Sequence, residues 1–199
     1  MRHVRNLLFA VAVAAPLFAQ NAAPPPLEIW TADKVHSSTE FRIRHLMSNV
    51  RGNFRDFDAT VAIDRADPTR STVEFNIRSA SIDTGDPGRD EHLRSPDFFE
   101  AAKYPTISFK SEKVVPKSPT LFDVTGNLTM HGVTKKVTLP VKFNGYMHDG
   151  RNDRAGFEIE TTLDRKDYGI TWNRILDEGG VLLGDEVKVQ IDLQVVKRK

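Results

Sequence analysis

Apolar and polar residues alternate along most of the 199-residue chain. In the clearest segment, 187–195, every odd position is apolar and every even position is polar or charged. A period of two places one face of a β-strand against an apolar interior and leaves the other face in water. The same period recurs over 41–43, 57–63, 73–77, 122–130, 137–143 and 157–163. The pattern therefore predicts about eight or nine half-buried antiparallel strands.

Turn signals separate these segments, and helix is scarce. Asp-Pro-Thr at 67–69 and His-Asp-Gly at 148–150 suit hairpin or loop connections. Ser95 as an N-cap, followed by Pro96, predicts a short helix over 95–100, and a further turn of helix is expected within 85–94. Gly52 and Phe54 have the opposite parity from Phe57, which predicts a single strand that carries a β-bulge.

Half-buried antiparallel strands assemble into either a sandwich or a closed barrel, and periodicity alone does not choose between them. Long strands of about ten residues that follow one another in simple order favour an up-and-down barrel. The hydrophobic content of 39% and the charged content of 28% are ordinary for a globular protein. The length suits one all-β domain, which we expect over residues 27–199.

The first residues, 1–19, have the features of a secretory signal peptide. Arg2 and Arg5 precede an uncharged apolar run over 7–15, and Ala19 offers a small residue for cleavage. The alternative is a membrane anchor, but the run breaks at Pro16 and is shorter than the roughly 20 residues of a spanning helix. Residues 20–26 form a proline-rich leader. We therefore expect a soluble periplasmic or secreted protein without stable membrane insertion.

Charge and composition exclude several classes of function. The 28 Lys and Arg residues nearly balance 27 Asp and Glu residues, so nothing indicates a nucleic-acid partner. The chain has no cysteine, which excludes disulfides, thiolate catalysis and thiolate metal sites. The histidines are scattered without the spacing of a metal site, and no Gly-x-Ser-x-Gly elbow is present. We therefore predict no metal, no cofactor and no catalytic residues.

Short motifs follow one another in a fixed order along nearly the whole chain. They are DKVHS at 33–37 with Phe41 and His45 after it, GNF at 52–54, RDEHLRSPDFF at 89–99, YPTISF at 104–109, GNLTMHGVT at 126–134, RKDYGI at 165–170 and GDEV at 184–187. This ordered set resembles the YceI-like family of bacterial exported, lipocalin-like proteins. The resemblance implies an eight-stranded antiparallel lipocalin-like barrel with one or two short helices, built around a long apolar cavity. It also implies binding of an isoprenoid lipid, such as a polyprenyl phosphate or an isoprenoid quinone, and implies no reaction.

The inward-facing positions of the predicted strands would line that cavity. Periodicity alone favours the alternative in which these side chains simply fill the barrel, because packed interiors are usual. The family resemblance favours a cavity instead. The predicted lining residues are Phe41, Ile43, His45, Phe75, Ile77, Phe122, Val124, Leu128, Leu139, Val141, Phe143, Phe157, Ile159, Val189 and Ile191.

Two loops dense in charge supply candidate contacts for a ligand head group, because arginine pairs with phosphate and can hold a quinone carbonyl. In the alternative interpretation these loops are only solvated, with Asp90 or Asp167 fixing their geometry. His45, at the end of its strand, either meets the head group or bonds to backbone. The candidate head-group residues are Arg89, Asp90, His92, Arg94, Arg165 and Asp167.

The sequence thus predicts a protein that binds, and carries or stores, an amphiphilic isoprenoid. One alternative is a cell-envelope enzyme that modifies such a lipid, using His45 with Asp90 or Asp167. Another is an interaction module that delivers lipid or electrons to a membrane cytochrome through a transient contact. The sequence leaves open whether the protein forms a homo-oligomer.

Overall fold

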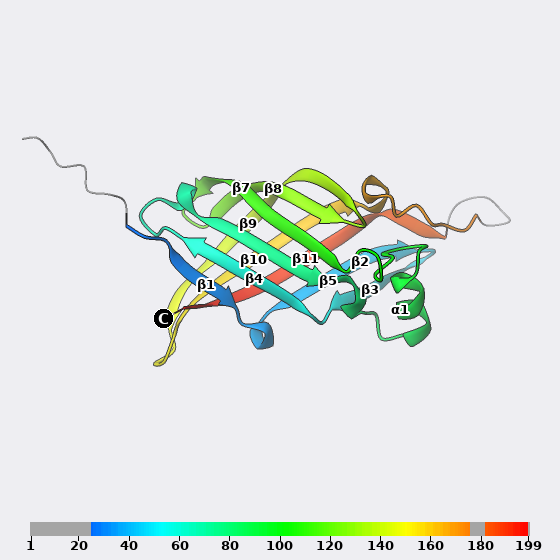
Figure 1. Cartoon of the computed structure of the whole chain (residues 1–199), viewed down its shortest axis with the longest axis horizontal. Helices are drawn as coiled ribbons and strands as arrows, with labels where there is room; N and C mark the ends of the chain where they lie inside the picture. Colours follow the sequence, from blue (N-terminus) through cyan, green and yellow to red (C-terminus); the bar gives the residue numbers. More distant parts are fainter. Residues whose placement is uncertain (1–24, 176–181, 199) are drawn as a thin grey trace, which may run out of the picture.

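The computed structural model describes residues 25–175 and 182–198, which form a twisted antiparallel sheet with one short α-helix (Figure 1). The helix is α1 (Pro87–Arg94), and four short 3-10 turns, η1 to η4, punctuate the loops. The strands are β1 (Glu28–Ala32), β2 (Ser38–His45), β3 (Ser48–Phe54), β4 (Phe57–Ile63), β5 (Thr72–Arg78), β6 (Ile82–Asp83), β7 (Thr106–Ser118), β8 (Leu121–Met130), β9 (Val133–His148), β10 (Asp153–Asp164) and β11 (Leu183–Lys197).

The sheet closes on itself. The order β1-β4-β5-β7-β8-β9-β10-β11 returns to β1 through an antiparallel β1–β11 pairing. The three remaining strands lengthen this ring, because β2, β3 and β6 continue β1, β4 and β5 and pair with one another and with β11. The molecule is therefore a closed eight-stranded antiparallel barrel with one α-helix, which confirms the predicted fold class.

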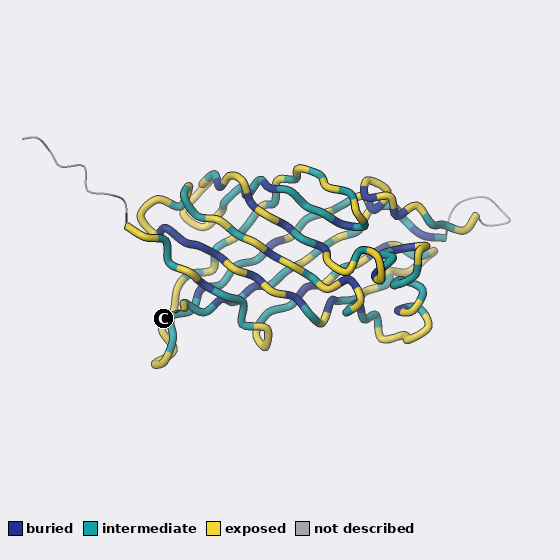
Figure 2. The backbone as a smooth tube through the Cα atoms, viewed as in Figure 1, coloured by how far each residue is buried: buried dark blue, intermediate teal, exposed yellow. Residues whose placement is uncertain are grey.

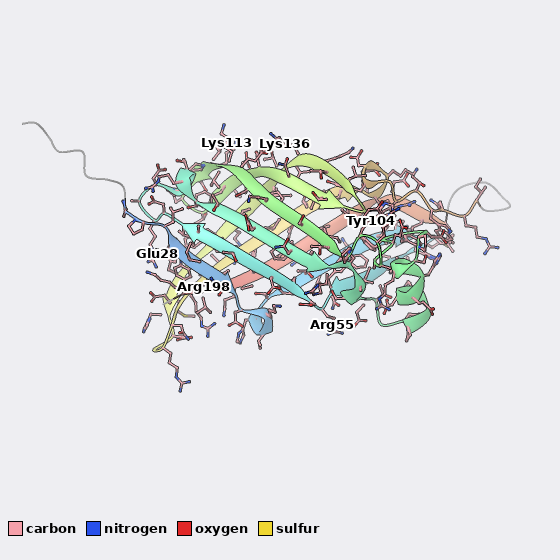
Figure 3. The ribbon with its side chains drawn as sticks, viewed as in Figure 1. Glu28, Arg55, Tyr104, Lys113, Lys136 and Arg198 are labelled. Carbon is pink, nitrogen blue, oxygen red and sulfur yellow. The ribbon has the colours of Figure 1, made fainter. Side chains whose placement is uncertain are left out.

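The two ends of the barrel are built differently. The C-terminus of β11 and the start of β1 lie at one end, which we call the base end, at the left of Figure 1. Helix α1 and the β2–β3 hairpin lie at the opposite end, which we call the mouth end. In Figure 3, Glu28 marks the base end and Tyr104 lies toward the mouth end.

The predicted alternation is present along the strands. On β11, Lys188 and Gln190 are exposed, whereas Val187 and Val189, which alternate with them, are half-buried. Figure 2 shows the same change from buried to exposed along neighbouring strands. Because the outer face is polar and the inner face is apolar, closure of the sheet places the apolar side chains around a common axis.

The buried side chains gather in two clusters, one toward each end. The cluster at the base end centres on Trp30 and Val195, which are both fully buried. The cluster at the mouth end adds Phe98 and Tyr168, which lie outside the strands, to strand residues such as Ile43, Ile82 and Leu183. The mouth end therefore combines packing between strands with packing of loop residues, whereas the base end depends on packing between paired strands.

The predicted helix over 95–100 is wrong. That segment forms turns, and the helix lies just before it, where Asp86 caps α1 by accepting from the Arg89 amide and Pro87 occupies the first turn. The α1 helix ends at Arg94, with the Ser95 amide bonded to the His92 carbonyl. Helical geometry cannot continue through Glu100, because its φ of 45° lies in the left-handed region.

The predicted bulge between Phe54 and Phe57 is also wrong, because the chain forms two separate strands there. Arg55 and Asp56 lie between β3 and β4, and the Arg55 amide donates to the Ser81 carbonyl instead of continuing the ladder. This interruption adjoins two others, η1 (Lys34–His36) between β1 and β2 and η3 (Ser79–Ser81) between β5 and β6. Three neighbouring barrel strands therefore break side by side.

The predicted signal peptide, residues 1–19, lies outside the described residues, as do residues 20–24 of the predicted leader. Both remain predictions from the sequence. Among the helices formed by residues 25–175 and 182–198, none has the length and hydrophobicity required to cross a bilayer.

Candidate ligand-binding cavity

The barrel interior holds two apolar chambers. The mouth chamber, of about 520 Å³, is lined by residues from β2, β3, α1 and the loops at the mouth end. The base chamber, of about 290 Å³, is lined by residues nearer the base end, including Val61, Val141 and Tyr146. We call the five side chains that line both chambers the waist: Phe75, Phe109, Leu139, Ile159 and Ile191. The chambers together offer a long, narrow apolar space.

Partial exposure of inward-facing side chains shows that the interior is not filled. Leu139, Val141 and Phe143 alternate with exposed residues on β9, so they point inward, yet all three retain partial exposure. On the adjoining strands β7 and β8, Val114 and Val124 are 8% and 5% exposed, which is typical of packed side chains. The solvent-sized space next to β9 is therefore inside the barrel.

All fifteen predicted lining residues face this space. Phe41, Ile43, His45, Ile77, Leu128 and Val189 line the mouth chamber alone. Phe122, Val124, Val141, Phe143 and Phe157 line the base chamber alone. Phe75, Leu139, Ile159 and Ile191 belong to the waist.

Part of the mouth chamber comes from residues that strand periodicity does not reveal. The His92 ring stands edge-on to Phe98 and Trp172, with ring centroids 5.0 and 4.9 Å away. Phe99 meets Phe54 in the same manner at 5.7 Å. These aromatic side chains cover the mouth from α1, the segment after it and the loop after η4 (Arg165–Tyr168). The apolar pair Phe98-Phe99, in an otherwise charged segment, was the sequence signal that could have revealed this aromatic cover.

Arg89 is the charged residue best placed to meet a ligand. It lines the mouth chamber, its Nε donates to Thr84 Oγ1 at 2.7 Å, and its Nη2 donates to the Thr84 carbonyl at 3.1 Å. Within the described residues no carboxylate pairs with Arg89. Because a guanidinium has five N–H donors, Arg89 keeps donors and an uncompensated positive charge for an anion.

Arg65, which lines the base chamber, is compensated. Its Nε donates to Glu28 at 2.8 Å, and its guanidinium lies 4.1 Å from the centroid of the Tyr146 ring and 5.5 Å from that of Trp30. Burial raises the pKa of Tyr146, so the phenol stays neutral under this cation. The base end therefore offers an arginine that already has its partners.

Three other candidate head-group residues are bonded within the loops. Asp90, 7% exposed, accepts from the Thr84 amide and from Thr84 Oγ1 at 2.8 and 2.6 Å. Arg94 donates to the carbonyls of Ala80 and Ile82. Asp167 is exposed and pairs with Lys135. None of Asp90, Arg94 and Asp167 is among the described residues that line either chamber, so their contacts support loop structure.

Arg165 lines the mouth chamber, but its donors are already used. It donates to the carbonyls of Gly184, Ile170 and Trp172 and to Asp185 at 3.1 Å, with only 4% of its side chain exposed. The hydrogen bond from Lys166 and the nearby positive charges lower the pKa of Asp185. Arg165 therefore holds together the loops that carry the mouth wall.

His92 and His45 complete the polar lining of the mouth. His92 Nε2 lies 2.8 Å from Asp97 Oδ2, which orients the ring against its aromatic neighbours. His45 lines the mouth chamber at the end of β2, opposite Leu183 of β11. Within residues 25–175 and 182–198, no cluster of three or more His, Asp or Glu side chains could hold a metal ion.

A closed antiparallel barrel with a narrow apolar interior defines the lipocalin-like class of ligand-binding barrel. The chain belongs to the YceI-like family, whose domain model matches residues 30–195. A UPF0312 protein of Azotobacter vinelandii is 38% identical over 169 residues, which cover 84% of this chain and 88% of that protein.

Solved structures share the fold. Burkholderia cenocepacia BcnA superposes with a TM-score of 0.72 at 25% identity, covering 82% of this chain and 98% of that chain. A polyisoprenoid binding domain from Saccharophagus degradans superposes with a TM-score of 0.64 at 16% identity, covering 85% and 98%.

Proposed function

We propose that this protein binds an amphiphilic isoprenoid, with the apolar tail running from the mouth chamber through the waist into the base chamber. The polar head group then lies at the mouth, next to Arg89, His92 and His45. The observation that carries this proposal is the unfilled apolar interior, with an uncompensated arginine at one end only.

A long unsaturated chain suits this space on physical grounds. An eight-stranded barrel leaves room for one slender ligand, not for a wide one. Each buried methylene-sized group contributes about 0.8 kcal/mol, so a five-carbon isoprene unit contributes about 4 kcal/mol. A few such units outweigh the cost of immobilising the chain. The isoprenoid then remains inside the barrel because its escape into water is unfavourable.

The comparisons support this proposal. The polyisoprenoid binding domain from Saccharophagus degradans shares this barrel fold. We further propose that the protein carries or stores its ligand outside the cytoplasm, as the sequence of residues 1–19 indicates. The enzymatic alternative has less support, because Asp90 bonds to Thr84 and Asp167 pairs with Lys135, and neither bonds to His45 within the described residues.

Organic extraction of the purified protein, followed by mass spectrometry, tests the proposal. We expect a polyprenyl or quinone species in the extract and rebinding of an added polyprenyl phosphate by the delipidated protein. Extracts from several expression hosts that contain no isoprenoid, together with no binding of added ones, would refute the proposal. Chemical change of the added lipid during incubation with the protein would instead favour the enzymatic alternative.

A further inference from the structure

The mouth end carries large apolar side chains that are open to solvent. The β2–β3 hairpin turns through Leu46 and Met47, which are 46% and 92% exposed. Leu46 has a φ of 49°, in the left-handed region that a bulky residue rarely adopts. Glycine at the first position is usual in a two-residue turn in which only that residue has a positive φ. A turn that accepts this strain while exposing two large apolar residues indicates a use for that surface.

A third apolar residue lies beside this hairpin. The Leu46 amide donates to the Leu182 carbonyl at 3.0 Å, and the Leu182 amide donates to the Arg174 carbonyl at 2.9 Å. Ile175, which follows Arg174 in the chain, is 79% exposed. His45 and Leu182 line the mouth chamber, so these side chains border its entrance. We call Leu46, Met47 and Ile175 the apolar tip.

Next to the apolar tip, the outer wall carries an unusual row of like charges. Lys188 of β11 lies directly opposite Arg42 of β2, and Arg42 lies directly opposite Arg51 of β3. All three are exposed, as is Arg44, two residues nearer the tip. Like charges in directly opposed positions destabilise a sheet, so packing gives no reason for this arrangement. We call Lys188, Arg42, Arg51 and Arg44 the cation row.

The cation row is not neutralised by its surroundings. Within the described residues, none of its four members takes part in an ion pair, although many other surface cations do. Asp164, Asp185 and Glu186 line the same outer hollow, and Asp185 is engaged by Arg165 and Lys166. The four cations of the row therefore face two carboxylates, Asp164 and Glu186. The row therefore presents an excess of positive charge to whatever approaches the mouth.

The base end makes the contrast clear. Met147 is 62% exposed there, and Arg154, directly opposite it on β10, pairs with Asp33 and Asp149. Lys197 pairs with Glu28. Arg151 and Arg198 at the base end take part in no ion pair within the described residues, but they do not form a row of directly opposed cations like the one at the mouth end.

We propose that the apolar tip and the cation row together dock the mouth onto a bilayer that contains anionic phospholipids. Apolar side chains enter the boundary between head groups and acyl chains, and arginines bind phosphates through paired hydrogen bonds. This proposal rests on the proposed function for its purpose: docking brings the cavity entrance to the membrane from which an isoprenoid enters. The contact is peripheral and reversible, as only three apolar side chains enter the bilayer.

Sedimentation with vesicles tests the apolar tip. We expect the protein to bind vesicles of phosphatidylethanolamine and phosphatidylglycerol, and to bind phosphatidylcholine vesicles weakly. Leu46→Gly combined with Met47→Ser should lower binding to the anionic vesicles roughly tenfold, because it removes two inserting side chains. The hairpin should fold at least as well, since glycine suits the positive φ at position 46. Met147→Ser, which removes an exposed methionine at the base end, is the matched control and should leave binding unchanged.

A second pair of variants tests the cation row. Arg42→Gln combined with Arg51→Gln should weaken binding to the anionic vesicles roughly thirtyfold and relieve the repulsion between opposed strands. Lys113→Gln combined with Lys136→Gln removes the same charge from another part of the outer wall, where Figure 3 labels both lysines, and should have a much smaller effect. Added salt should weaken binding of the unmodified protein.

Mass spectrometry of bound lipid, measured on the same samples, separates this proposal from the proposed function. Tip and cation variants that lose vesicle binding but keep their isoprenoid support docking. Equal losses of vesicle binding in the variants and their controls would overturn it, as would vesicle binding that does not depend on phosphatidylglycerol. A protein that contains isoprenoid but binds only membranes bearing proteins would also overturn it, in favour of a protein partner. Vesicle binding with the expected variant losses, by a protein that takes up no isoprenoid, would refute the proposed function alone.

Discussion

The two ends of the barrel each place an arginine against the apolar interior, but in opposite electrostatic states. At the base end, Arg65 pairs with Glu28 and covers aromatic rings. At the mouth end, the Arg89 side chain bonds only to Thr84, a neutral residue, and its guanidinium has no carboxylate partner within the described structure. The same residue type thus closes one end and leaves a charge at the other. We therefore expect the mouth end to discriminate between ligands by the polarity of their head group, and the base end to discriminate by the length of their apolar chain.

The largest expected effect comes from filling the base chamber. Val141→Trp places an indole in the space between Leu139 and Phe143, where an unfilled chamber can accept it. Binding of a long polyprenyl phosphate should fall roughly a thousandfold for each isoprene unit excluded, because each unit contributes about 4 kcal/mol. A short-chain isoprenoid, which needs only the mouth chamber, should bind as before. Competition binding with isoprenoids of increasing length measures both.

Lys142→Trp is the control for that variant. Lys142 is exposed and pairs with Glu158 on the outer wall, so a tryptophan there should not alter lipid binding. Denaturant unfolding of the delipidated proteins separates a filled chamber from a damaged fold. Overpacking a close-packed core costs about 1–3 kcal/mol, and such a loss in Val141→Trp would contradict the open base chamber.

An intermediate effect is expected at the mouth. Arg89→Gln should weaken binding of a polyprenyl phosphate roughly tenfold to a hundredfold, because hydrogen bonds to charged groups contribute about 1.5–3 kcal/mol. Binding of the matching isoprenoid alcohol should hardly change. Arg65→Gln should leave the ratio between phosphate and alcohol affinities unaltered. If Arg65→Gln changed that ratio and Arg89→Gln did not, the head group would lie at the base end.

The smallest effect is a pH dependence at the base end. Burial opposes ionisation of Glu28, but hydrogen bonds from Lys197 and Arg65 outweigh it and lower the pKa below its ordinary value of 4.5. A lowered pKa stabilises the fold above about pH 4.5, and this contribution is lost as the pH falls through the folded-state pKa. Urea unfolding should therefore show a smaller acid-induced loss of stability in Glu28→Gln than in the unmodified protein. Identical pH profiles would show that ionisation of Glu28 does not contribute to the stability of the closed barrel.

Sequence reasoning predicted the strands that have one face in water and the other face against the apolar interior. In β9 and β11 every second side chain meets water, so the period of two gave both the strands and the direction of each side chain. This is why inward positions as far apart as Phe41 and Ile191 proved to line one interior. The period did not distinguish a sandwich from a closed barrel; the length and order of the strands and the family resemblance favoured the barrel.

The parts that were missed depend on contacts between distant segments. Period and turn chemistry could not reveal that Arg165 binds backbone carbonyls of both the loop after η4 and the start of β11, or that Trp172 packs on His92. The loop arginines looked equivalent as charges in the sequence. Only the fold distinguishes Arg94, whose bonds go to carbonyls, from Arg89, which retains free donors.

The side-by-side breaks in three neighbouring barrel strands bear on how the molecule opens. They divide one wall into a base-end part, β1, β4 and β5, and a mouth-end part, β2, β3 and β6, with no continuous strand backbone between the two. Strand β6 pairs only with β3 in the described structure, so the mouth-end part of the wall ends in a short edge strand. Segments with fewer ladder bonds open at lower free energy than the whole fold does. Amide protons of β3 and β6 should therefore exchange with solvent through a sub-global opening, while those of β8 to β10 await complete unfolding.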